Sequence, residues 1–272
     1  MAMNRTGLVI ALAVAAATGL LFGLYPRLDI ELSAWFFDPI AQGFRAGRTT
    51  GSGVSWPALG RDFAMGVVTA LAVPAGVTLL VKLLRPGMRM LIPARAAVLL
   101  VTTLLLAPGL LTNVLLKEHW GRPRPIDVRE FAGSETFVAW WDPRGSCLHN
   151  CSFVAGEGSG AFWALAPAAL APPPLRPLAY GAALGFGAAT GTLRIAFGGH
   201  FFSDVVFSGV FTFLIIWVVH GLLYRWPRPA ISDAALEAAI GRTLQPIHPP
   251  FANLVSLLHA LLRRISRRPS GV

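Results

Sequence analysis

The sequence predicts an all-α, polytopic membrane protein with six transmembrane helices. Of its 272 residues, 54% are hydrophobic and only 13% are charged, and the mean hydropathy is +0.60. A soluble domain has about a quarter of its residues charged. The apolar residues also fall in blocks that approach the ~20 residues a helix needs to cross a bilayer. These observations indicate a helical membrane protein with no separate soluble domain.

The chain is basic, with a formal net charge of +10 at pH 7. In a membrane protein, cytosolic loops and a basic tail next to anionic lipid account for such a charge. Nucleic-acid binding is a weak alternative, because no recognition motif accompanies the charge. We therefore expect membrane lipids, and not nucleic acid, as partners.

Residues 1–63 are expected to hold the first transmembrane helix and an external loop. The apolar block at residues 7–25 is longer than a signal-peptide core of about 7–15 residues, which indicates a retained span with a cytosolic N-terminus. Residues 26–63 are polar and contain several aromatics. We interpret them as an external loop with a short interfacial helix at residues 30–37.

Residues 64–225 are expected to form a core of five further spans. The predicted spans are residues 64–84, 96–116, 152–171, 178–197 and 201–223. Basic residues that follow the second and the last span mark cytosolic segments by the positive-inside rule. They are Lys82, Arg85, Arg89, Arg95, Arg225 and Arg228. Both ends of the chain are therefore predicted to lie in the cytosol.

Residues 226–272 are predicted to form a basic cytosolic tail. Ser232 can cap a short helix at residues 232–240. Apolar residues between positions 251 and 265 recur near helical spacing beside several arginines, which is typical of an amphipathic helix on the cytosolic leaflet. A partly disordered tail is the alternative.

The two cysteines, Cys147 and Cys151, lie in the predicted external loop between the third and fourth spans. They are too few for a zinc site, and no histidine pair lies beside them at zinc-finger spacing. An extracytoplasmic loop permits a local disulfide. Two free buried thiols are an equal alternative.

Three polar clusters are predicted to meet at the external membrane edge. Residues 117–125 (KEHWGRPRP) end the third span, residues 151–159 (CSFVAGEGS) begin the fourth, and Arg194, His200 and Asp204 lie between the fifth and sixth. Charged groups are costly at membrane depth, so they are functional candidates there. Their convergence on one side of the membrane indicates a single site.

The chemistry that these clusters favour is phosphate binding. Lys117, Arg124 and Arg194 supply three cations, and guanidinium groups bind phosphate oxygens in a bidentate fork. Gly156 opens a predicted helix, whose first N–H groups can donate to an anion. Further candidate contacts are Arg122, Ser152 and His119, although a solvated loop histidine is the more common reading of His119.

His200 and Asp204 are spaced for a nucleophile and its orienting carboxylate. If the segment is helical from residue 201, the two side chains share a face and can form a hydrogen bond. A helix-capping aspartate and an interfacial histidine are the alternative interpretation. Glu157 is a carboxylate at the membrane edge, where partial desolvation favours the protonated form that a general acid needs.

The clusters resemble the motifs of the type 2 phosphatidate phosphatase superfamily, which read K-x6-R-P, P-S-G-H and S-R-x5-H-x3-D. The residues that match the first and third motifs are Lys117, Arg124, Pro125, Arg194, His200 and Asp204. The resemblance covers residues 64–223, the predicted core.

The second motif departs from the superfamily pattern. Residues 154–157 read VAGE, so only Gly156 is kept, Ala155 stands where the serine is expected, and Glu157 replaces the histidine. Leu193 also replaces the serine before Arg194. The stretch at residues 150–157 is similar to a subgroup that includes lipid A phosphatases of Gram-negative bacteria.

The resemblance implies a mechanism. It makes His200 the nucleophile that forms a phosphohistidine, and Asp204 the group that holds its tautomer. The three cations hold and neutralise the phosphoryl oxygens. We hypothesise that Glu157 protonates the departing alkoxide and then activates water. No metal and no other cofactor is implied.

The resemblance therefore implies a lipid phosphate phosphatase of the bacterial inner membrane, with its active site at the periplasmic edge. Its substrate would enter sideways from the outer leaflet, and lipid A is the first choice. Undecaprenyl diphosphate, phosphatidylglycerol phosphate and phosphate transfer between lipids are alternatives. A catalytically silent phospholipid-binding relative is the rival from another class, whereas the six spans argue against a soluble vanadium haloperoxidase. The sequence does not determine the oligomeric state.

Overall fold

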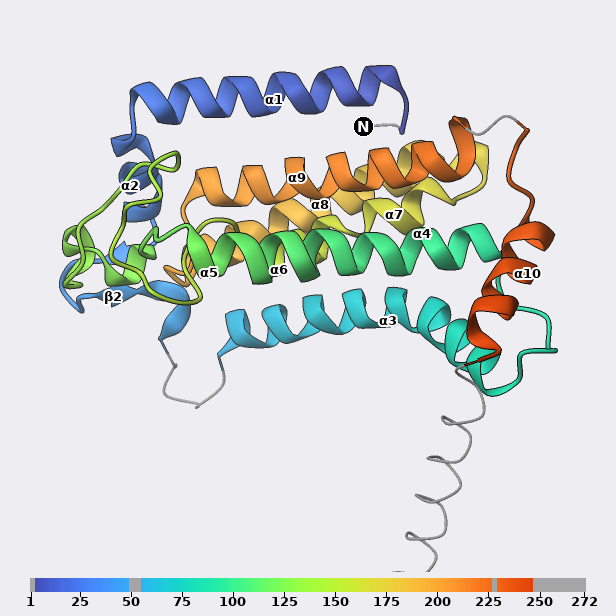
Figure 1. Ribbon diagram of the computed structural model, residues 1–272. Helices are drawn as coiled ribbons and strands as arrows, with labels where there is room; N and C mark the ends of the chain where they lie inside the picture. Colours follow the sequence, from blue (N-terminus) through green and yellow to red (C-terminus); the bar gives the residue numbers. More distant parts are fainter. Residues whose placement is uncertain (1–2, 49–54, 227–228, 247–272) are drawn as a thin grey trace, which may run out of the picture.

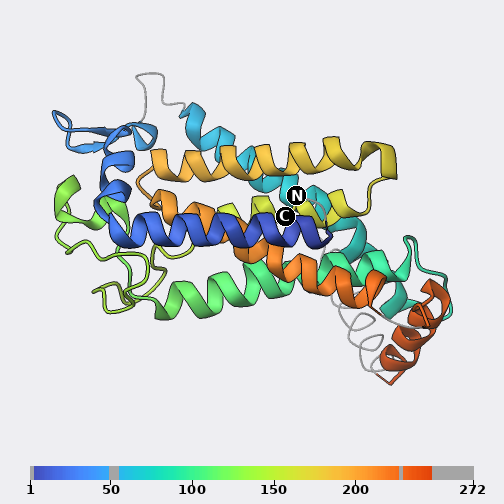
Figure 2. The same cartoon turned by 90° about the horizontal axis from the view of Figure 1, so that it is seen from above.

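The computed structural model describes residues 3–48, 55–226 and 229–246 of the chain. Its long helices run side by side in a bundle (Figures 1 and 2). Loops and short elements gather at one end of the bundle, and helix α10 lies at the other (Figure 1). The described N-terminal residues lie at the α10 end (Figure 1), so both described chain ends lie at one end of the bundle, and their cytosolic location stays a prediction.

Among the described residues, four helices are long and apolar enough to cross a membrane. They are α1 (Arg5–Leu24), α3 (Trp56–Leu84), the continuous helix Ala94–His119 and the continuous helix Phe202–Arg225. The third of these comprises α4 (Ala94–Leu104), a π-helical stretch η2 (Leu105–Leu116) around Pro108, and α5 (Lys117–His119). The fourth comprises α9 (Phe202–His220) and π-helical η6 (Gly221–Arg225). The protein is thus a helical membrane protein, and the count of six spans stays a prediction.

The two other expected spans look different from each other. Helix α8 (Arg176–Ala196) is a single helix of 21 residues, rich in glycine and threonine and so less apolar than the four. Residues 152–171 do not form the continuous helix that was predicted; they hold the short helices α6 (Gly156–Phe162) and α7 (Leu165–Ala169). Pro167 accounts for the break, because it has no N–H and its ring crowds the carbonyl of Trp163.

The site end of the bundle is built from short elements. The interfacial helix is present as α2 (Arg27–Ala34), three residues earlier than predicted. The other short elements are β1 (Phe37–Asp38), β2 (Gly43–Phe44), η1 (Arg45–Gly47), η3 (Pro125–Asp127) and η4 (Arg129–Phe131). Strands β1 and β2 pair antiparallel, with Phe37 opposite Phe44. Phe44 packs in turn against Phe131, which ties the hairpin to the loop after α5.

Cys147 and Cys151 form a disulfide in that loop. This decides between the two alternatives for the cysteines in favour of the bonded pair. The backbone of the bonded segment is also fixed to the end of the third long helix. Cys151 N donates to the carbonyl of Lys117 (2.8 Å) and Cys147 N donates to that of Gly121 (3.0 Å).

Helix α10 (Asp233–Leu244) closes the opposite end of the bundle. The short turn η5 (Pro173–Leu175) connects α7 to α8. The predicted cap is confirmed, since Ser232 Oγ accepts from Ala235 N at 3.1 Å. Asp233 pairs with Arg95 (2.9 Å) and Glu237 pairs with Lys82 (2.9 Å). The predicted second tail helix at residues 251–265 lies outside the described residues, as does Arg228.

Helix α8 approaches its neighbours closely through two glycines four residues apart. A Cβ added at Gly187 would lie 2.2 Å from the ring of Phe162 on α6. One added at Gly191 would lie 2.2 Å from Val205 Cγ1 on α9. Such small-xxx-small spacing lets helices in membranes pack backbone to backbone. The close contact sets α6, α8 and α9, which carry two of the three polar clusters, at fixed separations.

This packing predicts that Gly187→Ala destabilises the protein and that Gly185→Ala on the same helix does not. No atom lies within 4 Å of a Cβ at Gly185, and alanine is the better helix former. Overpacking at Gly187 should cost about 1–3 kcal/mol. The measurement is thermal unfolding of both variants in one detergent. Equal midpoints for both variants would contradict the proposed close contact.

Candidate active site

The structure brings the three polar clusters together at one pocket. The cavity has a volume of about 430 Å³. Six of the predicted site residues line it, and these are Lys117, Arg124, Gly156, Glu157, Arg194 and His200. Its other lining residues include Arg61, Asn113 and Asn150 at the polar side and Met65, Val68, Leu104 and Pro108 at the apolar side. The pocket is therefore amphiphilic.

The cations reach the pocket from three different segments. Lys117 lies at the end of the third long helix, where its ammonium approaches the start of α6. A Cβ at Gly156 would lie 3.4 Å from Lys117 Nζ and 3.0 Å from Asn113 Oδ1. The guanidinium of Arg124 donates twice to the carbonyl of Asn150, at 2.6 and 3.1 Å.

Arg194 lies in the last turn of α8, and the glycine pair after it makes room for its side chain. A Cβ at Gly199 would lie 2.5 Å from Arg194 Nη2, so a larger residue there would displace the guanidinium. Gly198 has φ of +68°, a left-handed conformation that glycine adopts without strain. The small-residue break in the sequence thus turns the chain from α8 into α9 and sets His200 beside Arg194.

His200 is 2% exposed, and its ring is held by one hydrogen bond. Its Nδ1 lies 2.6 Å from the carbonyl oxygen of Ser152. A carbonyl only accepts, so Nδ1 carries the proton and Nε2 has the free lone pair. Burial lowers the pKa of His200 well below its usual value, and the nearby charges of Lys117 and Arg194 lower it further. The ring is thus a neutral imidazole with Nε2 available as a nucleophile.

The predicted hydrogen bond between His200 and Asp204 is not present among the described contacts. Helix α9 begins at Phe202, so His200 precedes the helix and the four-residue spacing does not place the two side chains on one face. Asp204 instead accepts from Ser152 Oγ (2.5 Å) and from Phe201 N (2.9 Å). Asp204 therefore reaches His200 through Ser152.

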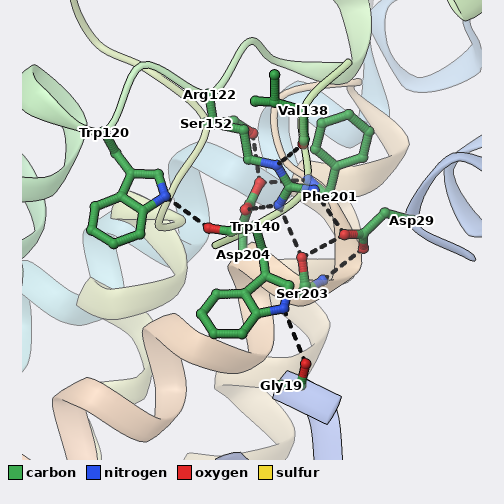
Figure 3. Close-up of polar contacts among 10 residues, drawn as sticks. All are labelled: Gly19, Asp29, Trp120, Arg122, Val138, Trp140, Ser152, Phe201, Ser203 and Asp204. Atoms are coloured by element: carbon green, nitrogen blue, oxygen red, sulfur yellow. Dashed lines mark hydrogen bonds and ion pairs between the residues drawn. The ribbon is translucent and has the colours of Figure 1, made fainter. Parts of the chain in front are cut away.

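Ser152, Arg122 and His119 were predicted as additional phosphate contacts, and none of them lines this pocket. Ser152 is buried between His200 and Asp204. Arg122 is 0% exposed and pairs with Asp204 (2.5 Å) and with Asp29 (2.8 Å), as Figure 3 shows. His119 is exposed and its Nδ1 lies 2.9 Å from the carbonyl of Leu115.

Arg61 is a pocket residue that the sequence analysis missed. Its Nε donates to both oxygens of Glu157, at 2.8 and 2.9 Å, and its Nη2 lies 2.7 Å from Oε1. Arg194 Nε lies 3.7 Å from the same carboxylate. Helix α3 begins eight residues before the predicted span. The sequence does contain a signal for a helix that starts here, because a serine at position 55 can cap the helix and Pro57 fits its first turn.

Asp29 was also missed, because an acidic residue in a predicted interfacial helix has no distinguishing pattern. It lies on α2 and is buried against Arg122 and Ser203 (Figure 3). Among the described residues, no group of three or more His, Cys, Asp or Glu side chains is placed to hold a metal ion.

An imidazole that stays neutral among cations can attack phosphorus, and the apolar helices that frame the pocket place it within reach of lipids. Comparison with known proteins gives the family. Residues 96–228 match the PAP2 superfamily, and the chain belongs to it. The family and the similar proteins described next make the protein a membrane-bound phosphoric monoester hydrolase of the lipid phosphatase class.

Three proteins named lipid A 4'-phosphatase are similar to this chain. That of Francisella tularensis subsp. novicida is 33% identical over 225 residues, which cover 82% of this chain and 98% of that protein. That of Rhizobium leguminosarum is 43% identical over 104 residues, 38% of this chain and 45% of its own length. That of Rhizobium etli is 42% identical over 102 residues, 38% of this chain and 40% of its own. No solved structure matches significantly.

The lowered pKa of His200 predicts that its ring stays neutral at pH 6.5, near the ordinary imidazole value. Because the unfolded chain takes up a proton near the ordinary value while the folded ring stays neutral, the free energy of unfolding falls as the pH drops below 6.5. The measurement is ¹⁵N NMR of histidine-labelled protein in detergent, with the His200 signals assigned by their loss in His200→Ala. A His200 ring half-protonated at pH 6.5, or protonated at Nε2 in its neutral form, would contradict the geometry.

Proposed function

We propose that the protein hydrolyses a phosphate monoester of lipid A through a phosphohistidine intermediate, at the periplasmic face of the bacterial inner membrane. The observation that carries the proposal is the convergence of Lys117, Arg124, Arg194 and His200 on one pocket. The choice of lipid A is supported by the three relatives, each of which is named lipid A 4'-phosphatase.

The first chemical step joins His200 to the phosphoryl group. Nε2 attacks phosphorus, a P–N bond forms, and the P–O bond to the lipid breaks. The cations of Lys117, Arg124 and Arg194 neutralise the charge on the phosphoryl oxygens as it spreads in the transition state. In the second step water attacks the phosphohistidine, the P–N bond breaks and inorganic phosphate leaves.

Glu157 is the proposed proton donor to the departing lipid oxygen and the acceptor of the proton from water. In this structure its carboxylate binds the guanidinium of Arg61 and lies near that of Arg194. A phosphate dianion binds the guanidinium groups of Arg61 and Arg194 more strongly than a carboxylate does. Its arrival therefore competes for both arginines. The released carboxylate takes up a proton from the solvent and, as a carboxylic acid, faces the leaving oxygen.

The shape of the pocket supports lateral entry of a lipid. Met65 and Val68 of α3 and Leu104 of α4 line it together with the cations. The acyl chains of a lipid whose phosphate binds Arg194 would lie beside α3 and α4, which belong to segments long and apolar enough to cross a membrane. A headgroup can thus reach His200 while the acyl chains stay in the membrane.

The test is phosphate release by the purified protein in detergent, without added metal. The substrates are lipid A, undecaprenyl diphosphate, phosphatidylglycerol phosphate and phosphatidate, each run beside His200→Ala. We expect release from lipid A, its loss in the variant, and a ³²P-labelled protein after acid-free quenching, because phosphohistidine is acid-labile.

Release from a different lipid would correct the substrate and keep the mechanism. Transfer of phosphate to an added lipid, without release, would make the protein a phosphotransferase. No turnover of any lipid by folded protein would favour the phospholipid-binding relative and contradict the proposal.

A proton-donor role predicts that Glu157→Gln slows the enzyme according to the leaving group. Lipid phosphate hydrolysis should fall by about 10²–10⁴-fold, the range for general acid catalysis. An aryl phosphate should be affected far less, because a phenolate leaves without a proton. Glu130→Gln, in an exposed loop outside the pocket, is the matched control. Full turnover of the lipid by Glu157→Gln would show that the acid role is wrong.

A further inference from the structure

A charged cluster without contact to water lies beside the pocket. We define the buried ion cluster as Asp29, Arg122, Ser203 and Asp204. Both carboxylates bind one guanidinium, with Asp29 Oδ2 2.8 Å from Arg122 Nη2 and Asp204 Oδ1 2.5 Å from Nη1 (Figure 3). The side chains of all three charged members are at most 1% exposed. Such groups are costly to bury unless their hydrogen bonds are complete.

The hydrogen bonds of the cluster are extensive. Arg122 Nη1 also donates to Ser203 Oγ (2.9 Å), and its Nε donates to the carbonyl of Val138 (3.1 Å). Asp29 accepts from Ser203 N (2.9 Å) and from Ser203 Oγ (2.5 Å). Asp29 binds Nη2 of the guanidinium and Asp204 binds Nη1, so the group is held from two sides.

The cluster connects to the nucleophile through Ser152. Ser152 N donates to the carbonyl of Arg122 (2.8 Å), and its hydroxyl donates to Asp204 Oδ2 (2.5 Å). The carbonyl of the same residue accepts from His200 Nδ1 (2.6 Å). An unbroken series of hydrogen bonds therefore leads from Asp29 through Arg122, Asp204 and Ser152 to His200.

The charge of the cluster suits this connection. Two carboxylates and one guanidinium leave a net charge of minus one. Without Asp29, Arg122 and Asp204 would be a neutral pair. With Asp29 present, Arg122 is shared between two carboxylates, so it neutralises the charge of Asp204 only in part. The other oxygen of Asp204, Oδ2, accepts from Ser152. Negative charge behind His200 stabilises the positive imidazole that forms when Nε2 bonds to phosphorus.

We propose that Asp29 is a positioning residue for His200 and acts through Arg122, Asp204 and Ser152. Asp29 lies on α2, before residues 96–228 that match the superfamily. Helix α2 thus supplies a positioning residue from outside the matched region. The inference rests on the proposed role of His200 as nucleophile.

The test compares Asp29→Asn with Ser33→Ala. Ser33 lies on the same helix and is equally buried, and its Oγ has no hydrogen-bond partner in the described structure. We expect Asp29→Asn to lower kcat about 10–100-fold, the range for groups that orient a reactive histidine through a second partner. KM and the Kd for inorganic phosphate should stay unchanged, because the pocket cations are untouched. Ser33→Ala should leave all three constants unchanged.

Two outcomes would overturn the proposal. One is a kcat for Asp29→Asn within twofold of the wild type. The other is a parallel loss of kcat and phosphate affinity, since this would show that Asp29 only supports the fold. If Asp29→Asn does not fold, Ser152→Ala removes the hydroxyl link and keeps the carbonyl that binds His200. A kcat for Ser152→Ala within twofold of wild type would then overturn the proposal.

A double variant measures whether the two residues act in one series. Asp29→Asn combined with Ser152→Ala should lower kcat no more than the stronger single variant, because both break the same connection. If the double variant lowered kcat by the product of the two single effects, Asp29 and Ser152 would not act on His200 through one connection. The ¹⁵N resonance of His200 Nδ1 separates this inference from the proposed function. It should shift in Asp29→Asn and not in Ser33→Ala, even if no lipid tested is a substrate.

Discussion

The arrangement of the site end depends on one guanidinium that has no contact with water. Arg122 is 0% exposed and lies between carboxylates from α2 and α9, under the rings of Phe201 and Phe137. Removing the guanidinium would leave two buried carboxylates without their partner, which is far more costly than never burying the charges. The N-terminal unit, the loop after α5 and the start of α9 are therefore held in one arrangement.

The pocket that results separates two electrostatic tasks. Three cations converge on the pocket, and burial together with the charges of Lys117 and Arg194 lowers the pKa of His200. On the other side of the ring, Nδ1 is held by the carbonyl of Ser152, whose hydroxyl donates to Asp204. The ring is therefore fixed at Nδ1, and its Nε2 is left free.

The sequence predicted the site residues that have a fixed spacing and failed for those that act through a partner. Lys117, Arg124 and His200 were found because their spacing is a family pattern. Arg122 was assigned to phosphate, since an arginine near a phosphate motif gives no sign of a carboxylate 93 positions away. For the fold, the long apolar blocks gave the helices. The break at Trp163 depends on Pro167 and on packing against α8, which hydropathy does not report.

The disulfide has a consequence for where the site can be assembled. Asn150, whose carbonyl holds Arg124, lies inside the small ring closed by Cys147 and Cys151. Thiols in the cytosol stay reduced, whereas disulfides persist in oxidising compartments. The disulfide therefore restrains the backbone carbonyl that holds Arg124, and an oxidising compartment preserves that restraint.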